Sequence, residues 1–243
     1  MAFRDVLLVV VLTVGGLLLG ASCRRRAPDL PVYDTPGWED AYQLLLRGSS
    51  PDAADLLLRT VTPTEAAGAD LAASVPPPDS VIYRYQPGAE RLEPVGAAAW
   101  TAATGVVCDC RAEAQTIDPF AFDLPSGTLK FQGRVLSTAK PTVVNAVASP
   151  SGRYVAVFSA KRKQHFSLSP VPFIGGGGWS YEEQYHEVFE RSDGTRVGKP
   201  VALPPPEMWI PAPCWSYDER YVVYVSEAKL CIVPTNLKQG DDQ

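Results

Sequence analysis

Short segments in which hydrophobic and polar residues alternate fill most of the chain after residue 80. Three pairs of these segments flank a glycine-containing turn: Val81–Tyr85 with Arg91–Val95, Phe120–Asp123 with Thr128–Phe131, and Glu187–Glu190 with Thr195–Val201. Alternation over four to eight residues on both sides of such a turn is typical of a β-hairpin. The pattern therefore predicts three antiparallel hairpins in this part of the chain.

A longer pattern occurs twice between these hairpins. Ala146–Ser159 aligns without a gap on Pro213–Ser226, which begins 67 positions later. Five aligned positions are identical: Ser149/Ser216, Arg153/Arg220, Tyr154/Tyr221, Val155/Val222 and Ser159/Ser226. In each copy a polar turn precedes an apolar run rich in valine and aromatic residues, which predicts two strands joined by a tight turn. A weaker third copy at Trp100–Cys108 would make repeats and hairpins alternate, so that each repeat plus hairpin supplies four strands.

Ala148–Ala156 and Trp215–Val222 resemble the blade signature Trp-Ser-Pro-Asp-Gly-Arg-Tyr-Ile-Ala of TolB-type β-propellers. The resemblance covers at most residues 80–237 and implies antiparallel four-stranded blades. Closed propellers have four to eight blades of about 40 residues, and about 155 residues supply only three or four. We therefore expect a mainly β fold that is either a minimal, incomplete propeller or a sandwich-like stack of blades whose edges need covering.

Two segments before the β region show apolar residues at helical spacing. Trp38–Arg47 places Trp38, Ala41, Tyr42, Leu45 and Leu46 at this spacing, and Ala53–Thr60 continues it with Leu56–Leu58 after Pro51. They predict a short helical hairpin. A single unit of this kind cannot bury its own apolar face, so we expect it to pack against the β domain.

The N-terminus is a leader with competing interpretations. Val6–Ser22 is apolar and uncharged, Arg4 precedes it, and Cys23 and three arginines follow it. As a signal segment it would end at Leu19-Gly20-Ala21-Ser22-Cys23, which resembles a bacterial lipobox and implies diacylglyceryl attachment at Cys23. As a retained transmembrane helix its length is at the short end of the spanning range, and the arginines after it would keep the following domain in the cytoplasm. A plain secretory signal is the third interpretation.

All three interpretations make the protein membrane-associated or exported. We favour an extracytoplasmic location for the domain, with the cytoplasmic face as the alternative for a retained helix. The chain is then divided into a leader or anchor (1–26), a linker with the helical hairpin (27–79), a propeller-like β domain (80–237) and a tail (238–243).

The composition agrees with a β-rich globular protein that does not bind nucleic acid. The chain is 46% hydrophobic and 20% charged, and its 23 prolines outnumber its 19 glycines, which disfavours long helices. Without Arg4, Asp5 and the arginines of the leader, 18 basic and 26 acidic residues remain. An acidic body of this kind gives no electrostatic reason to bind nucleic acid.

The sequence contains no catalytic, cofactor or metal motif. His165 and His186 are the only histidines, and neither has a second ligand at helical metal spacing or a serine or cysteine elbow nearby. Cys108, Cys110, Cys214 and Cys231 are an even set compatible with disulfides, and we expect buried or disulfide-bonded cysteines rather than a zinc site. We predict a protein that is not an enzyme and that has no cofactor, no catalytic residue and no metal site.

Two irregular segments are candidate partner contacts. Ser167–Tyr185 places Phe173 and Ile174 before four glycines, and Trp179 and Tyr181 after them. Aromatic residues on such a loop have three alternative roles: they bind a partner, insert into a membrane or pack back onto the β domain. Pro200–Pro213 is a stiff connection or a docking surface, and it contains the second candidate pair, Trp209 and Ile210.

These features predict a membrane-tethered, non-catalytic scaffold or accessory subunit of a larger membrane-associated complex, with a protein partner. The alternative is an exported lipoprotein that binds a small molecule or glycan at the blade tops. A concave polar pocket lined by residues such as Tyr154, Tyr221 and Asp218 would favour this alternative.

Overall fold

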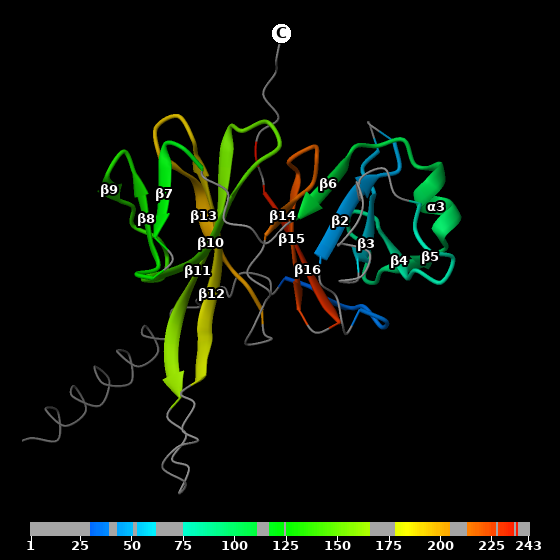
Figure 1. Ribbon diagram of the computed structural model, residues 1–243, viewed down its shortest axis with the longest axis horizontal. Coiled ribbons are helices and arrows are strands. Elements are labelled where there is room, and N and C mark those ends of the chain that lie inside the picture. The colour runs from blue at the N-terminus through cyan, green and yellow to red at the C-terminus, as the bar shows by residue number, and fades with distance from the viewer. Residues whose placement is uncertain are drawn as a thin grey trace, which may run out of the picture.

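The protein is described from a computed structural model as a mainly β fold built of antiparallel sheets (Figure 1). The structure describes residues 30–38, 43–50, 53–61, 75–110, 117–123, 125–165, 178–204, 213–226, 228–235 and 237. Expectations for the leader 1–26, including its hydrophobic helix, and for the tail 238–243 lie outside these residues.

Two of the four sheets contain strands from the N-terminal part of the chain. The N-terminal sheet has the order β5-β4-β3-β2-β6 and contains β2 (Gln43–Gly48), β3 (Leu56–Val61), β4 (Ile82–Tyr85), β5 (Glu93–Val95) and β6 (Val107–Cys110). The central sheet has the order β1-β16-β15-β14 and contains β1 (Val32–Asp34), β14 (Cys214–Trp215), β15 (Tyr221–Ser226) and β16 (Lys229–Pro234).

The other two sheets come from the middle of the chain. The small sheet has the order β7-β8-β9 and contains β7 (Phe120–Asp123), β8 (Thr128–Phe131) and β9 (Arg134–Val135). The arm sheet has the order β10-β11-β12-β13 and contains β10 (Thr142–Ala148), β11 (Tyr154–His165), β12 (Gly178–Glu190) and β13 (Arg196–Ala202).

The sheets are stacked face to face, and a separate hydrophobic cluster fills each interface. Leu46 and Leu58 of the N-terminal sheet pack with Val223 of the central sheet, whose other face packs on Phe158 of the arm sheet. The second face of the arm sheet contacts the small sheet. Figure 1 shows the resulting order, with the small sheet at one end and the helix α3 (Ala97–Ala102) at the other. The sheets do not close into a propeller ring.

The predicted helical hairpin is wrong, because its leucine-rich segments form the adjacent strands β2 and β3. Successive strand residues point to opposite faces of a sheet. Leu44 and Leu46 accordingly lie in the cluster shared with the central sheet, whereas Leu45 lies in the cluster under α3. A strand buried on both faces is a continuous apolar run, which its pattern alone does not distinguish from a buried helix.

The three predicted hairpins are confirmed, and so is the strand–turn–strand structure of the two stronger repeats. β4 pairs with β5, β7 with β8, and β12 with β13, each antiparallel. The repeats form β10–β11 and β14–β15. The proposed third repeat is wrong, because Trp100 lies in α3 and is buried on the outer face of the N-terminal sheet, whereas Trp215 lies in β14.

The N-terminal segment 30–38 joins the central sheet to the N-terminal sheet. β1 pairs with β16 as the fourth strand of the central sheet, with Val32 opposite Cys231. Four residues after β1, Trp38 is buried against Tyr83, with ring centroids 5.1 Å apart, and its Nε1 donates to the carbonyl of Val81 at 3.1 Å. This segment, near the start of the predicted linker region 27–79, therefore fastens two sheets together.

Candidate functional site

The turns of the two repeats have the same hydrogen-bond pattern. In the first turn, Ser149 N donates to Tyr154 O at 2.8 Å, and Tyr154 N donates to Ser149 Oγ at 3.1 Å. In the second turn, Ser216 and Tyr221 make the same two bonds at 2.9 and 3.0 Å. Each turn also contains one residue with a positive φ, Gly152 in the first and Glu219 in the second. The two tyrosines thus occupy equivalent places, as the repeat predicts.

Each repeat tyrosine packs toward the neighbouring sheet in the stack. Tyr154 lies between the arm and central sheets. Tyr221 lies between the central and N-terminal sheets, and its ring centroid is 5.5 Å from that of Tyr85. Tyr154 is therefore a core residue of one interface, and Tyr221 packs, partly buried, against the cluster of the next. Neither of them lines the pocket described next.

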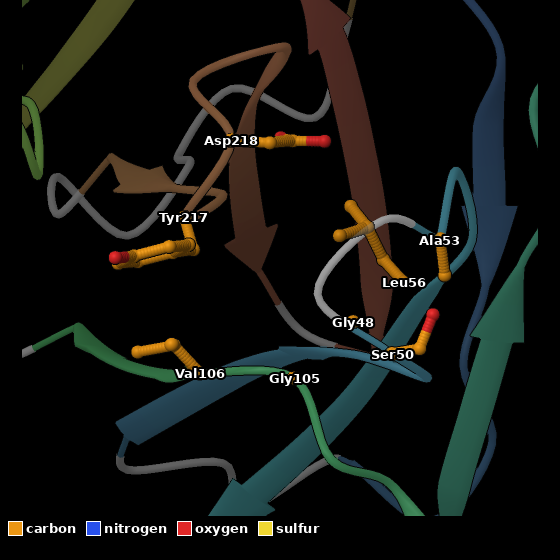
Figure 2. A pocket seen from close by; sticks show the side chains of 8 residues that line it. All are labelled: Gly48, Ser50, Ala53, Leu56, Gly105, Val106, Tyr217 and Asp218. Atoms are coloured by element: carbon orange, nitrogen blue, oxygen red, sulfur yellow. The ribbon is translucent and has the colours of Figure 1, made fainter.

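A pocket lies where the second repeat turn meets the N-terminal sheet (Figure 2). Its cavity volume is about 20 Å³, which is close to the space that one water molecule needs. In Figure 2, Tyr217 and Val106 stand on one side, and the loop between β2 and β3 lies on the other. The lining residues are Gly48, Ser50, Ala53, Leu56, Gly105, Val106, Tyr217 and Asp218.

The wall of the pocket depends on a close approach of two backbone segments. A Cβ atom on Gly105 would lie 2.3 Å from the carbonyl oxygen of Gly48. Only glycine fits there, because real Cβ atoms do not come this close to an oxygen. Arg47 holds the same segment by donating from its Nε to Gly105 O at 2.9 Å.

Polar contacts fix the upper rim of the pocket. Asp218 accepts from Ser216 Oγ at 2.6 Å and from the backbone N of Arg220 at 3.1 Å, and it pairs with the Arg220 guanidinium. Arg220 also donates to the carbonyl of Ala53 at 2.9 Å, which ties the turn to the N-terminal sheet. The Asp218 carboxylate is thus compensated by a cation within the site.

A second candidate site is the long hairpin of the arm sheet, which we call the arm. β10 pairs with β11 no further along the arm than Ala160, and β13 pairs with β12 no further than Tyr185. Residues 161–165 and 178–182 therefore pair only with each other in the described structure, as a two-stranded ribbon that projects from the body (Figure 1). Exposed ion pairs link its strands: Lys161 with Glu183 at 3.4 Å, and Lys163 with Glu182 at 2.6 Å.

Two buried polar groups lie on opposite faces of β12. His186 Nδ1 is 2.7 Å from the Tyr224 hydroxyl at the interface with the central sheet, and its Nε2 has no hydrogen-bond partner among the described residues. Burial lowers the pKa of His186 to about 3, so this imidazole is neutral. On the other face, Glu187 accepts from Ala139 N at 2.7 Å and from Ser159 Oγ at 2.8 Å. Arg196 lies 2.9 Å from its other carboxylate oxygen.

These two groups do not form a catalytic pair. Adjacent strand residues point to opposite faces, so the sheet separates the imidazole from the carboxylate. The partners of Glu187 fasten the segment between β9 and β10 to the arm sheet. We therefore interpret His186 and Glu187 as structural residues of two different interfaces.

The cysteine side chains that the structure describes are those of Cys108, Cys214 and Cys231, of which Cys108 is only half-buried. Cys214 is in a disulfide, whereas Cys108 and Cys231 are reduced thiols. Burial raises the pKa of Cys108 to about 11, with Asp218 adding to the rise, and burial raises the pKa of Cys231 to about 12. Both thiols are therefore protonated at neutral pH and are poor nucleophiles.

The structure describes only part of the predicted contact residues. Cys23, Phe173, Ile174, Trp209 and Ile210 lie outside the described residues. Trp179 and Tyr181 lie in β12 within the ribbon of the arm, where their backbones pair with Gln164 and Arg162. The sequence predicted Asp218 as a pocket residue but not Tyr217 or Val106. Val106 precedes β6, which is far in the sequence from the second repeat turn and meets that turn only in the fold.

No protein-family model matches the chain, and no curated protein sequence matches it. Among the residues that the structure describes, no helix has the length and apolar character needed to cross a bilayer. The same residues contain no group of three or more histidine, cysteine or acidic side chains placed to hold a metal ion.

Proposed function

We propose that the protein is a membrane-tethered, non-catalytic accessory subunit that contacts a protein partner through the end of the arm. The observation that supports this proposal is the two-stranded ribbon beyond Ala160 and Tyr185. A two-stranded hairpin without further strands is at best marginally stable in water. Its ion pairs add little, because they are exposed and solvent screens them.

The ribbon therefore contributes little to the stability of the body, which suggests a role at its end. The chain segment that connects its two strands contains Phe173 and Ile174, and Trp179 and Tyr181 follow in β12. Aromatic and large aliphatic residues are the usual anchors of protein interfaces. We assign the partner contact to these four residues, and Trp209 and Ile210 stay a second candidate contact.

The position of the leader supports tethering close to a bilayer. Val32 of β1 follows Cys23 by nine positions, so lipid at Cys23 would lie within about 30 Å of the central sheet even if the linker were fully extended. The disulfide at Cys214 favours an oxidising, extracytoplasmic compartment, because disulfides are rare in the cytoplasm. A lipid-anchored, exported domain agrees with both observations. A leader retained as a transmembrane helix is the alternative to the lipid anchor.

We interpret the stacked sheets as blades of an open, degenerate propeller related to the TolB type. The arm sheet has the expected composition of repeat plus hairpin, and the central sheet has a repeat followed by β16 and the N-terminal strand β1. In this interpretation the stack is a rigid base that holds the arm at a fixed height above the membrane.

Photocrosslinking of the full chain in its native membrane tests the proposal. A photoreactive phenylalanine analogue at position 174 should crosslink to one protein, and the Phe173→Ser/Ile174→Ser variant should no longer co-purify with that protein. The matched controls are the same analogue at Val135 and a Val135→Ser variant, since Val135 is 57% exposed on the small sheet. Thermal unfolding should be the same in all variants. Crosslinks to lipid alone, or unchanged co-purification, would reject the proposed contact.

A further inference from the structure

The disulfide of Cys214 has a partner that elimination restricts to two residues. Cys214 is disulfide-bonded, whereas Cys108 and Cys231 are reduced thiols. The chain has five cysteines, so the partner is Cys23 or Cys110. A diacylglyceryl group is attached to a cysteine through its sulfur atom. Cys23 is therefore able to bind the lipid or to bind Cys214, but not both.

The strand register places Cys110 on the face of the N-terminal sheet that meets the central sheet. Cys110 is opposite Leu44 in the pairing of β6 with β2, and directly opposite residues of antiparallel strands lie on the same face. Leu44 belongs to the cluster between the N-terminal and central sheets. Cys214 belongs to the same cluster and is 2% exposed. Cys110 is thus on the face toward Cys214.

The ends of two contacting strands bring these positions together. β6 lies beside β14, and Figure 1 shows the end of β6 next to that strand. Cys110 is the last residue of β6, and Cys214 is the first residue of β14. A disulfide needs Cα atoms about 4.4–6.8 Å apart, a separation that contacting strands provide. Cys231, by contrast, lies in the cluster on the other face of the central sheet.

We propose that Cys110 and Cys214 form an interface disulfide that is made after export and leaves Cys23 free for the lipid. This inference rests on the exported location in the proposed function. Each thiol loses one proton and one electron when the bond between the two Sγ atoms forms. The disulfide of a thiol–disulfide oxidoreductase accepts both electrons and both protons and becomes a dithiol. Proteins of this class act in the oxidising compartments where disulfides persist.

The bond joins two sheets through a long loop. Positions 110 and 214 are 104 apart in the sequence, and the loop between them contains every strand of the small and arm sheets. A crosslink that closes a long loop stabilises a protein mainly by restricting its unfolded chain. Arg220 already ties the same two sheets by donating to the carbonyl of Ala53. The disulfide therefore locks the base of the arm covalently.

Non-reducing peptide mapping of the full chain, exported from its own leader, tests the pairing. Cleavage before Asp109 separates Cys108 from Cys110, so their peptides are distinguishable. We expect one linked pair, Cys110 with Cys214, and alkylation of Cys108 and Cys231 as thiols. The reduced full chain, mixed with a purified oxidised thiol–disulfide oxidoreductase, should acquire the same pair and convert one oxidoreductase disulfide to a dithiol per chain.

Matched variants test the role of the bond. Cys110→Ala should leave a free thiol at Cys214 and lower Tm by about 5–10 °C. The control Cys108→Ala, two positions earlier on the same face, should keep the linked pair and change Tm by less than about 3 °C. In the presence of a reductant, the original protein and Cys110→Ala should unfold within about 2 °C of each other, because neither then has the bond.

Three results would overturn the assignment. The first is a link from Cys214 to any cysteine other than Cys110, and a link to Cys23 would also exclude the lipid there. The second is a free Cys214 thiol in the exported chain, or no reaction of the reduced chain with the oxidoreductase. The third is an equal decrease in Tm for the Cys110 and Cys108 variants. None of these results would affect the proposed contact through the arm, since that test measures a crosslink at position 174.

Discussion

Acidification should loosen the interface between the arm and central sheets, because that interface contains a neutral histidine. His186 is 1% exposed, and it lies against Tyr224 with ring centroids 5.9 Å apart. Its Nδ1 is within hydrogen-bond distance of the Tyr224 hydroxyl. Protonation would place a charge between two apolar sheets, and the buried carboxylate of Glu187 lies on the opposite face of β12.

The magnitude follows from the difference between the folded and unfolded pKa values. Burial lowers the pKa from the ordinary 6.5 to about 3. Between these pH values the unfolded chain binds a proton that the folded chain does not. The contribution of neutral His186 to the free energy of unfolding is therefore fully present above pH 6.5 and is lost as the pH decreases toward 3. Each pKa unit corresponds to about 1.4 kcal/mol, and a change from pH 8 to pH 5 should cost about 2 kcal/mol. For a chain of this length that is a decrease of about 4–8 °C in Tm.

Urea unfolding at pH 8 and pH 5, followed by tryptophan fluorescence, measures this effect. Both proteins should have His165→Asn, so that His186 is the only histidine, and one should also have His186→Asn. Asparagine keeps a hydrogen-bonding atom near Tyr224 but does not titrate, so the double variant should lose about 2 kcal/mol less between the two pH values. Equal losses in the two proteins, or an NMR titration of His186 near pH 6.5, would refute the reasoning.

Three further changes test other parts of the structure. Glu187→Gln keeps the size of this buried side chain but removes the charge opposite Arg196, and it should lower the free energy of unfolding by about 2 kcal/mol in a denaturant titration. An unchanged midpoint would show that the ion pair is not needed. Gly105→Ala should lower that free energy by more than about 2 kcal/mol, whereas the control Gly96→Ala, whose Cβ would meet nothing within 4 Å, should change it by less than about 1 kcal/mol. Reduction of the disulfide at Cys214 should cost about 2–4 kcal/mol, and non-reducing peptide mapping should find this cysteine cross-linked; a free Cys214 thiol in the native protein would contradict this.

The sequence predicted best those parts of the fold that local turn chemistry determines. Gly88, Gly127 and Gly194 all have positive φ in hairpin turns or beside them, and the segments around them alternate as half-buried strands do. The serine-to-tyrosine bonds of the two repeat turns are also local. These elements were correctly predicted because their residues determine the backbone within four or five positions.

The sequence misled where burial on two faces or distant pairing determined the structure. Leu44–Leu46 and Leu56–Leu58 are apolar throughout because their two strands are buried on both faces. The central sheet packs on one face, and α3 packs on the other. The pairing of β1 with β16 connects the two ends of the chain and leaves no local pattern. The pocket likewise depends on β6 and the second repeat turn coming together across two sheets, so only Asp218 was anticipated there.

The position of β1 also has a consequence for how the protein is made. Val32 is paired with Cys231 of β16, which follows it by 199 positions in the sequence. The central sheet therefore cannot be completed until β16 has been synthesised, and pairing of such distant segments is slow. Until then β1 lacks the strand with which it pairs, so the fourth strand of the central sheet is added late in folding.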